Sequence, residues 1–144
     1  MTPLPAGYAL TDDPSRVDVA AAHAYLSRSY WSPGIPFETV ERALANSICV
    51  AVFHDGAQVA LARVISDRAT FAYLADVYVL EEHRGKGLSK VMVEALHAHH
   101  ELQGLRRWSL FTADAQGLYA QLGWTSLSHP ERAMEILVPD IYQR

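Results

Sequence analysis

The sequence predicts a mixed α/β fold, and three observations carry this prediction. The chain has 144 residues, which is near the commonest size of one domain, and half of them are hydrophobic, which is enough for one core. Hydrophobic residues recur at helical spacing in the first 45 residues and again after residue 87. Between these regions, β-rich runs alternate with short polar turns. No repeat or Ser/Gly-rich linker divides the chain, so residues 1–144 are expected to form one domain.

The N-terminal part is expected to contain two helices after a short strand. Capping residues and prolines of the first helical turn mark the starts of helices, and both occur here. The expected elements are a strand around Tyr8–Leu10, a helix capped by Asp13 or Asp18 that runs to about Arg28, and a helix from Pro36 with Phe37, Val40 and Leu44 on one face.

The middle of the chain is expected to form an antiparallel meander. His54-Asp55-Gly56 is a turn, since Asp-Gly is a strong hairpin signal. A second polar turn lies at residues 66–68. These turns separate three expected strands, at Ser47–Phe53, Gln58–Ile65 and Thr70–Leu80.

From the strand at Thr70–Leu80 onward, the sequence predicts the order strand, helix, strand, helix, strand. Its first helix is strongly amphipathic, with Leu88, Val91, Met92, Ala95 and Leu96 on one stripe, and Gly104 stops it. The elements expected after it are a strand at Arg107–Thr112, a short helix at Ala113–Leu122 and a closing strand at Arg132–Val138.

The composition of the chain excludes some classes of partner and indicates a cellular compartment. The net charge is −4 and the Lys and Arg residues are scattered, whereas nucleic-acid binders concentrate basic residues on one face, so no nucleic-acid partner is expected. Cys49 is the sole cysteine, which excludes an intramolecular disulfide and suits a reducing compartment. The N-terminal residues do not resemble a signal peptide, and no run is long enough to span a bilayer. A cytoplasmic protein without a membrane partner is expected.

A glycine loop between the third meander strand and the amphipathic helix is the main candidate for ligand binding. It reads His83-Arg84-Gly85-Lys86-Gly87-Leu88-Ser89. Helix starts leave backbone N–H groups unpaired, and glycines let the backbone approach an anion, so this order of elements suits a phosphate or pyrophosphate. A solvated turn is the alternative. The Walker A pattern is absent, and the Rossmann pattern fails at Lys90.

Two segments together resemble the GNAT family of acetyltransferases. Glu82–Gly87 is similar to the acetyl-CoA motif Gln/Arg-x-x-Gly-x-Gly/Ala, and Ala115–Trp124 is similar to the family's Ala-x-x-Leu-Tyr-x-x-x-Gly-Phe segment. The resemblance implies the GNAT fold, with a mostly antiparallel twisted sheet of six to seven strands flanked by about four helices. Departures from the pattern are Glu82, Ser89 and Thr112, the last at a position where Asn often contacts the cofactor.

The resemblance also implies acetyl-CoA as cofactor, CoA as product, and an amine of a small molecule or peptide as acceptor. The implied cofactor contacts come from the strand before the loop, the loop itself and the segment after it. They are Val77, Tyr78, Val79, Arg84, Gly85, Lys86, Gly87, Leu88, Ser89, Thr112 and Tyr119. A backbone N–H near Val77 would polarise the acetyl oxygen. The sequence leaves a homodimer open.

Tyr119 matches the family's general acid, which protonates the departing sulfur. A phenol stays protonated at neutral pH and can therefore donate. The alternative is a core tyrosine that packs with Leu118 and Leu122. Asp76 is the carboxylate within a central apolar strand, and it is interpreted either as a general base or as a structural acceptor of hydrogen bonds. The positions that hold the usual glutamate in relatives hold Phe71 and Tyr73.

Tyr30, Trp31 and Phe37 flank Pro33-Gly34 between the first two helices, and they are the candidates for the acceptor pocket. His97 and His100 stand three apart near a helix end, but no set of ligands completes a metal site, so no metal is expected. Two other functions remain open at this point. One is an acetyl-CoA sensor without turnover, and the other is a phosphate or nucleotide binder that uses only Arg84–Ser89.

Overall fold

The computed structural model describes all residues from Met1 to Arg144 and is built around a five-stranded sheet. The strands lie in the order of the sequence. The first three neighbouring pairs are antiparallel and the last pair is parallel. The strands are β1 (Tyr8–Thr11), β2 (Ile48–His54), β3 (Ala57–Ser66), β4 (Phe71–Val79) and β5 (Arg107–Ser109).

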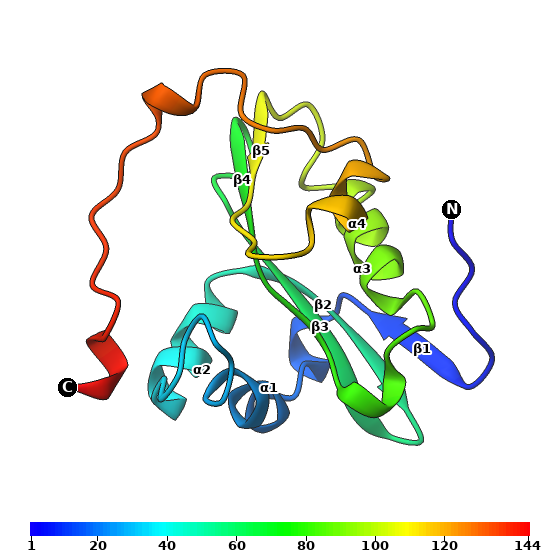
Figure 1. Cartoon of the computed structure of the whole chain (residues 1–144). Helices are drawn as coiled ribbons and strands as arrows, with labels where there is room; N and C mark the ends of the chain where they lie inside the picture. The colour runs from blue at the N-terminus through cyan, green and yellow to red at the C-terminus, as the bar shows by residue number, and fades with distance from the viewer.

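Four α-helices cover the sheet, with α1 and α2 on one face and α3 and α4 on the other (Figure 1). The Asp18 side chain accepts a hydrogen bond from the N–H of Ala21 and caps the first helix, whereas Asp13 caps a separate 3₁₀ turn before it. The helices are α1 (Val19–Leu26), α2 (Phe37–Ala45), α3 (Leu88–His97) and α4 (Gln116–Ala120). None of them is long and apolar enough to cross a bilayer.

Two apolar cores lie on opposite faces of the sheet. The larger packs the stripe of α3, including Met92 and Leu96, against β2, β3 and β4. The smaller packs Leu26 of α1 and Val40 of α2 against the other face. Burial of the helical stripes that the sequence predicted therefore fixes both layers on the sheet.

A bulge at Asp76 interrupts β4. Asp76 has a φ of 52°, in the left-handed region that few residues other than glycine adopt. The pairing with β3 slips between Leu61 and Arg63, opposite this point. In a regular strand, residues an even number apart face the same side of the sheet. Because of the bulge, Leu74 faces the α3 core, whereas Tyr78, four residues later, faces the α1–α2 core.

The expected sheet of six to seven strands is wrong, because the mixed sheet has five. The closing strand expected at Arg132–Val138 is also wrong. Residues 130–132 form a 3₁₀ turn that leads into extended backbone at Ala133, and residues 133–138 pair with no strand. Residues 125–144, called the tail below, leave α4 near the end of β5 and arch away to the side of α2 (Figure 1). A strand needs a partner for its backbone groups, and the tail has none within the chain.

Candidate active site

The glycine loop presents a row of unpaired backbone donors. Gly85 and Gly87 both have a φ of 78°, and Gly87 is the N-cap of α3. The N–H groups of residues 85–90 donate no hydrogen bond within the chain, since the donors on either side are Arg84 and Val91. Six consecutive free amides at the start of a ten-residue helix form a cradle for an anion.

Arg84 does not extend toward this cradle. Its Nε donates to the carbonyl oxygen of Val79 at 3.0 Å, and its guanidinium also donates to the Tyr25 hydroxyl at 3.0 Å. The side chain therefore ties the loop to the end of β4 and to α1. Lys86 is exposed in the loop and makes no ion pair.

The edge of β4 next to β5 is open over most of its length. β5 pairs only with Phe71 to Tyr73, because it ends at Ser109. Beyond that point β4 has no partner on this edge. Asp76 and Val77, at the bulge, also have no partner in the register with β3. This leaves an unpaired edge of β4 that runs toward the glycine loop.

Asp76 is held by two donors at the bulge. One carboxylate oxygen accepts a hydrogen bond from Trp31 Nε1 at 2.8 Å, and the other accepts one from Arg63 Nε at 2.8 Å. The Arg63 and Asp76 side chains are largely buried, and Arg63 also donates to the Ser47 hydroxyl. With both oxygens engaged by donors, the geometry favours the structural interpretation of Asp76 over the general base.

The α1–α2 loop brings two of the three predicted acceptor residues to this place. Trp31 reaches Asp76 as described, and Tyr30 packs edge-on against Trp31 with 5.0 Å between ring centroids. Phe37 lies apart, because it begins α2 and its ring packs against His23. Tyr30 and Trp31 are both well exposed, so they line an open surface rather than a closed core.

Tyr119 is buried on α4, with 7% of its surface exposed. Burial raises the pKa of its phenol, and the nearby Tyr30 hydroxyl adds to the increase. The ring packs against Trp124, and no protein group accepts a hydrogen bond from the hydroxyl. Thr112 holds the segment before α4, since its hydroxyl accepts a hydrogen bond from the N–H of Ala115. A protonated phenol is thus maintained on a supported helix.

Sequence reasoning missed Arg63 and Tyr25. Arg63 is the partner of Asp76, and Tyr25 links Arg84 to a stacked pair with Tyr78, whose ring centroid is 4.1 Å away. A signal for the first pair is present in the sequence. Arg63 is the lone charge in one apolar strand and Asp76 is the lone charge in the next, and burial of either alone would be costly.

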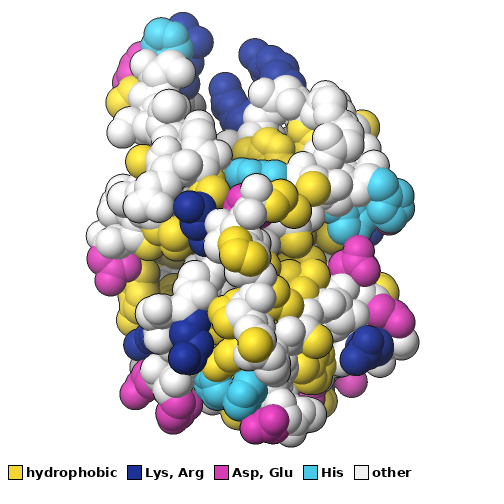
Figure 2. Space-filling view, turned by 90° about the vertical axis from the view of Figure 1, so that its right-hand side faces the viewer, with side chains coloured by type: hydrophobic (Ala, Val, Ile, Leu, Met, Phe, Trp, Pro, Cys, Tyr) yellow, Lys and Arg dark blue, Asp and Glu magenta, His cyan; other side chains and the backbone are white.

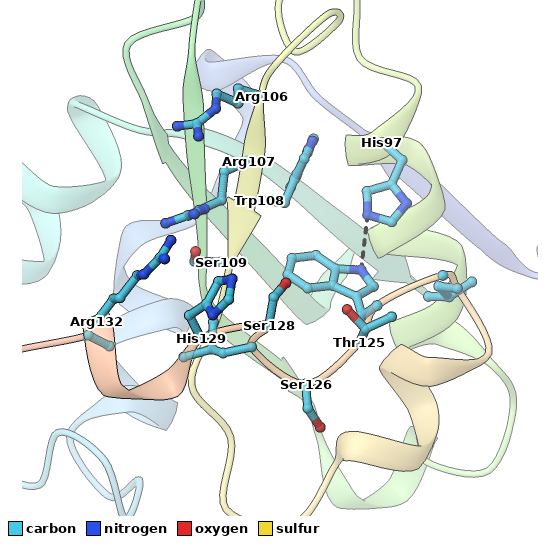
Figure 3. Close-up of a pocket in the computed structure, with 15 residues that line it drawn as sticks. His97, Arg106, Arg107, Trp108, Ser109, Thr125, Ser126, Ser128, His129 and Arg132 are labelled. Atoms are coloured by element: carbon cyan, nitrogen blue, oxygen red, sulfur yellow. Dashed lines mark hydrogen bonds between the residues drawn. The ribbon is translucent and has the colours of Figure 1, made fainter.

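The histidines near the end of α3 have structural surroundings. Burial lowers the pKa of His97, which is therefore neutral at pH 7, and His97 Nε2 accepts a hydrogen bond from Trp124 Nε1 at 3.2 Å (Figure 3). The structure brings no three His, Cys, Asp or Glu side chains together at a spacing that suits a metal ion.

Comparison with known proteins identifies the family. The model of the acetyltransferase (GNAT) domain family matches residues 45–126, which hold the open β4 edge, the glycine loop and α4. The chain belongs to the GNAT acetyltransferase family. A protein of Gibberella zeae that is named as an acetyltransferase is 33% identical over 137 residues, which cover 79% of this chain and 76% of that protein.

Solved structures agree with this assignment. A protein of Xanthomonas campestris pv. campestris assigned to the GNAT family is 50% identical, covers 95% of this chain and 97% of its own, and has a TM-score of 0.92. A more distant acetyltransferase from Clostridium acetobutylicum, solved with acetyl-CoA, is 15% identical, covers 90% and 94% of the two chains, and has a TM-score of 0.65. The chain is thus an acetyltransferase with the GNAT fold.

Proposed function

We propose that this acetyltransferase, acting as one domain over residues 1–144, moves an acetyl group from acetyl-CoA directly to a primary amine of a small molecule or peptide. The observation that carries the proposal is the row of six free amides at residues 85–90, next to an unpaired β4 edge. The amides of Gly85, Gly87, Leu88 and Ser89 are suited to bind the pyrophosphate of CoA. Val77 and Val79 offer backbone groups on the open edge to the pantetheine amides, whereas the backbone of Tyr78, between them, faces its partner Leu61 in β3. Acetyl-CoA in the Clostridium acetobutylicum relative supports this choice of donor.

Tyr119 is proposed as the general acid. Acetyl-CoA supplies an activated thioester carbonyl with a thiolate as leaving group. Tyr119 holds a proton on Oη, because burial keeps the pKa of the phenol above its ordinary value. That proton passes to the sulfur as the carbon–sulfur bond breaks and the nitrogen of the neutral amine bonds to the carbonyl carbon. The proton that this nitrogen then loses restores the phenol of Tyr119 through solvent. The N–H of Val77, at a bulge without a partner in the register of either neighbouring strand, is proposed to polarise the acetyl oxygen.

Asp76 is proposed as a positioning residue on the acceptor side. It holds Trp31 against the bulge, and Trp31 in turn packs on Tyr30. The exposed faces of these two aromatic rings form a surface suited to the carbon chain or charge of an amine. Thr112 contributes indirectly, by holding the segment that carries Tyr119.

Two measurements test the proposal. Acetyl-CoA and CoA should each raise the melting temperature, because a ligand that binds only the folded state stabilises it by about 2.7 kcal/mol at a hundredfold excess over its Kd. A response to ATP or NAD without a response to CoA would contradict the proposal. Release of free thiol from acetyl-CoA, followed across amines, polyamines, aminoglycosides and peptides, then identifies the acceptor. Activity toward alcohols alone would contradict amine transfer.

A further inference from the structure

A hollow of about 500 Å³ lies where β2 begins, and this volume is within the range of small-molecule sites. It is bounded by the segment after β1, the end of α2, the start of β2 and the residues after α3, and it is called the acidic hollow below. The glycine loop precedes α3, and the acidic hollow lies beyond the other end of this ten-residue helix, so about 15 Å separate the two. None of the residues proposed for acetyl transfer lines it.

Carboxylates dominate the wall of the acidic hollow. They are Asp12, Asp13, Glu41 and Glu101. The one Lys or Arg residue in the wall is Arg68, whose guanidinium pairs with Glu101. The Glu41 side chain has neither a hydrogen bond nor an ion pair, and the Asp12 side chain has no hydrogen bond. The wall therefore has a surplus of negative charge that suits a cationic ligand.

Positive charge gathers elsewhere on the molecule. In Figure 2 a notch opens at the top of the molecule with basic side chains on both sides. A second hollow, along β5, is lined by Arg106, Arg107 and Arg132 and by no carboxylate (Figure 3). A cation is therefore attracted to the acidic hollow and repelled from the one along β5.

His99 presents a hydrogen-bond donor in the acidic hollow. Its side chain is 8% exposed, and its Nδ1 accepts a hydrogen bond from the N–H of Glu101 at 3.1 Å, so the neutral imidazole has its proton on Nε2. Nε2 makes no hydrogen bond, since Asp12 Oδ2 is 3.8 Å away. Nε2 is not sealed in the core, because the Tyr78 hydroxyl is the one fully buried side-chain group without a partner. A ligand with an oxygen acceptor would satisfy this donor.

The floor of the acidic hollow is apolar and held in place. Leu44 and Ile48 are both buried there, and Val17 is half-buried beside them. Between α2 and β2, the Ser47 hydroxyl donates to the Ala43 carbonyl oxygen at 2.7 Å. A fixed apolar floor under a polar wall is the usual form of a site for a small molecule.

We propose that the acidic hollow binds an amino alcohol, that is, a small organic cation with a neutral oxygen acceptor near its ammonium group and an apolar body. The ammonium group lies among the wall carboxylates, and the hydroxyl oxygen accepts from His99 Nε2. The apolar body covers Leu44 and Ile48. An amino acid is disfavoured, because its carboxylate would be repelled by the wall. This site is separate from the acceptor surface, and the inference does not depend on acetyl transfer.

Calorimetry on the full chain without acetyl-CoA, with phenylethanolamine as the probe, tests the proposal. Two matched probes each lack one group. α-Methylbenzyl alcohol has no ammonium group and should bind at least about tenfold more weakly, and phenethylamine has no hydroxyl and should bind about fivefold more weakly. Absence of binding, or equal affinity for the three probes, would overturn the proposal.

Variants of the wall test which groups hold the probe. The double variant Asp12→Asn and Glu41→Gln should raise the Kd for phenylethanolamine at least about tenfold, because it removes the two carboxylates without a hydrogen bond. The double variant Glu38→Gln and Asp114→Asn makes the same change in net charge at exposed residues outside the hollow, and it should leave the Kd unchanged. Equal Kd values for the two double variants would count against the site.

His99→Asn tests the hydroxyl contact. Asparagine keeps an acceptor near the position of Nδ1 for the N–H of Glu101 and removes the Nε2 donor. Phenylethanolamine and phenethylamine should then bind with nearly equal Kd values. If the fivefold preference for phenylethanolamine persisted, His99 would not be its cause and the assignment of an amino alcohol would be wrong.

Amide chemical shifts of the wild-type chain locate the probe without any substitution. Phenylethanolamine should shift the amides of Val17, Ile48 and Glu101, which line the acidic hollow, and leave those of the glycine loop unchanged. Shifts confined to the α1–α2 loop would assign the probe to the acceptor surface and overturn the proposal.

Discussion

The indole of Trp31 donates a hydrogen bond to Asp76 over a distance of 2.8 Å, although the two residues are 45 positions apart. This bond joins the α1–α2 loop to the bulge of β4. The Arg63 guanidinium holds the other oxygen of the same carboxylate. The aromatic surface proposed for the acceptor is thereby tied to the strand that is proposed to bind the acetyl donor.

Trp31→Phe should raise the acceptor KM and leave acetyl-CoA binding nearly unchanged. The substitution keeps an aromatic ring but removes the N–H donor, so the side chain of residue 31 is no longer held by a hydrogen bond to Asp76. We expect an increase in KM of about tenfold, equivalent to about 1.4 kcal/mol, as for one hydrogen bond to a charged group. Steady-state kinetics with a fixed, saturating concentration of acetyl-CoA measures it. A large fall in melting temperature without a change in KM would instead assign Trp31 to the core.

Gly87→Val should weaken CoA binding far more than Lys86→Ala. Valine disfavours the left-handed backbone that Gly87 adopts, and the distorted loop would no longer aim its free amides at one anion. Lys86 contributes one solvated charge, which is worth little. Calorimetry on the folded variants gives the ranking.

Gly56→Val is the matched control for backbone strain. Gly56 has a φ of 79° in the β2–β3 hairpin and has open space around it, so the substitution imposes similar strain away from the loop. It should lower stability and leave CoA affinity intact. If Lys86→Ala proved the more damaging of the two loop variants, side-chain charge rather than the amide cradle would hold the donor.

Tyr78→Phe should leave the protein equally stable or stabilise it by about 1 kcal/mol, because the buried Tyr78 hydroxyl lies near the Gln58 side chain but makes no hydrogen bond of good geometry. The substitution should also change how the free energy of unfolding depends on pH in alkaline solution.

Burial raises the pKa of Tyr78 to about 12, so the unfolded chain loses this proton first, near pH 10. Tyr78 therefore costs the native protein stability as pH rises from 10 to 12, and the variant should be free of that loss. Urea unfolding at pH 8 and pH 11 measures both effects, and an equal alkaline loss in the two proteins would contradict the assignment.

The fold was largely predictable because its helices have strong periodicity and its turns have clear signals. The stripe of α3, the meander and the Asp18 cap all follow from local pattern. The bulge at Asp76 was not predictable, since a left-handed aspartate leaves no mark in the alternation of an apolar strand. Its partner Arg63 is 13 residues away in the sequence, and the pairing register of β3 and β4 brings the two side chains together.

The C-terminal error has a different physical origin. Residues 132–138 have the composition of a strand, but a strand forms only where an edge is available to it. In the single chain the tail leads away from β5, so the local signal is present and the partner is missing. The glycine loop and Tyr119, in contrast, are predicted as site residues from a motif, which does not depend on how the strands pair.

Tyr119→Phe tests the central claim most directly, because it deletes one hydroxyl and keeps the ring that packs against Trp124. Tyr142→Phe, at an exposed tyrosine of the tail, is the control for loss of a hydroxyl. If Tyr119 protonates the leaving sulfur, kcat should fall by about 10²- to 10⁴-fold, with the KM for acetyl-CoA and the melting temperature nearly unchanged. A kcat equal to that of the wild-type protein, on any amine that the enzyme accepts, would contradict the proposed mechanism and remove Tyr119 from it.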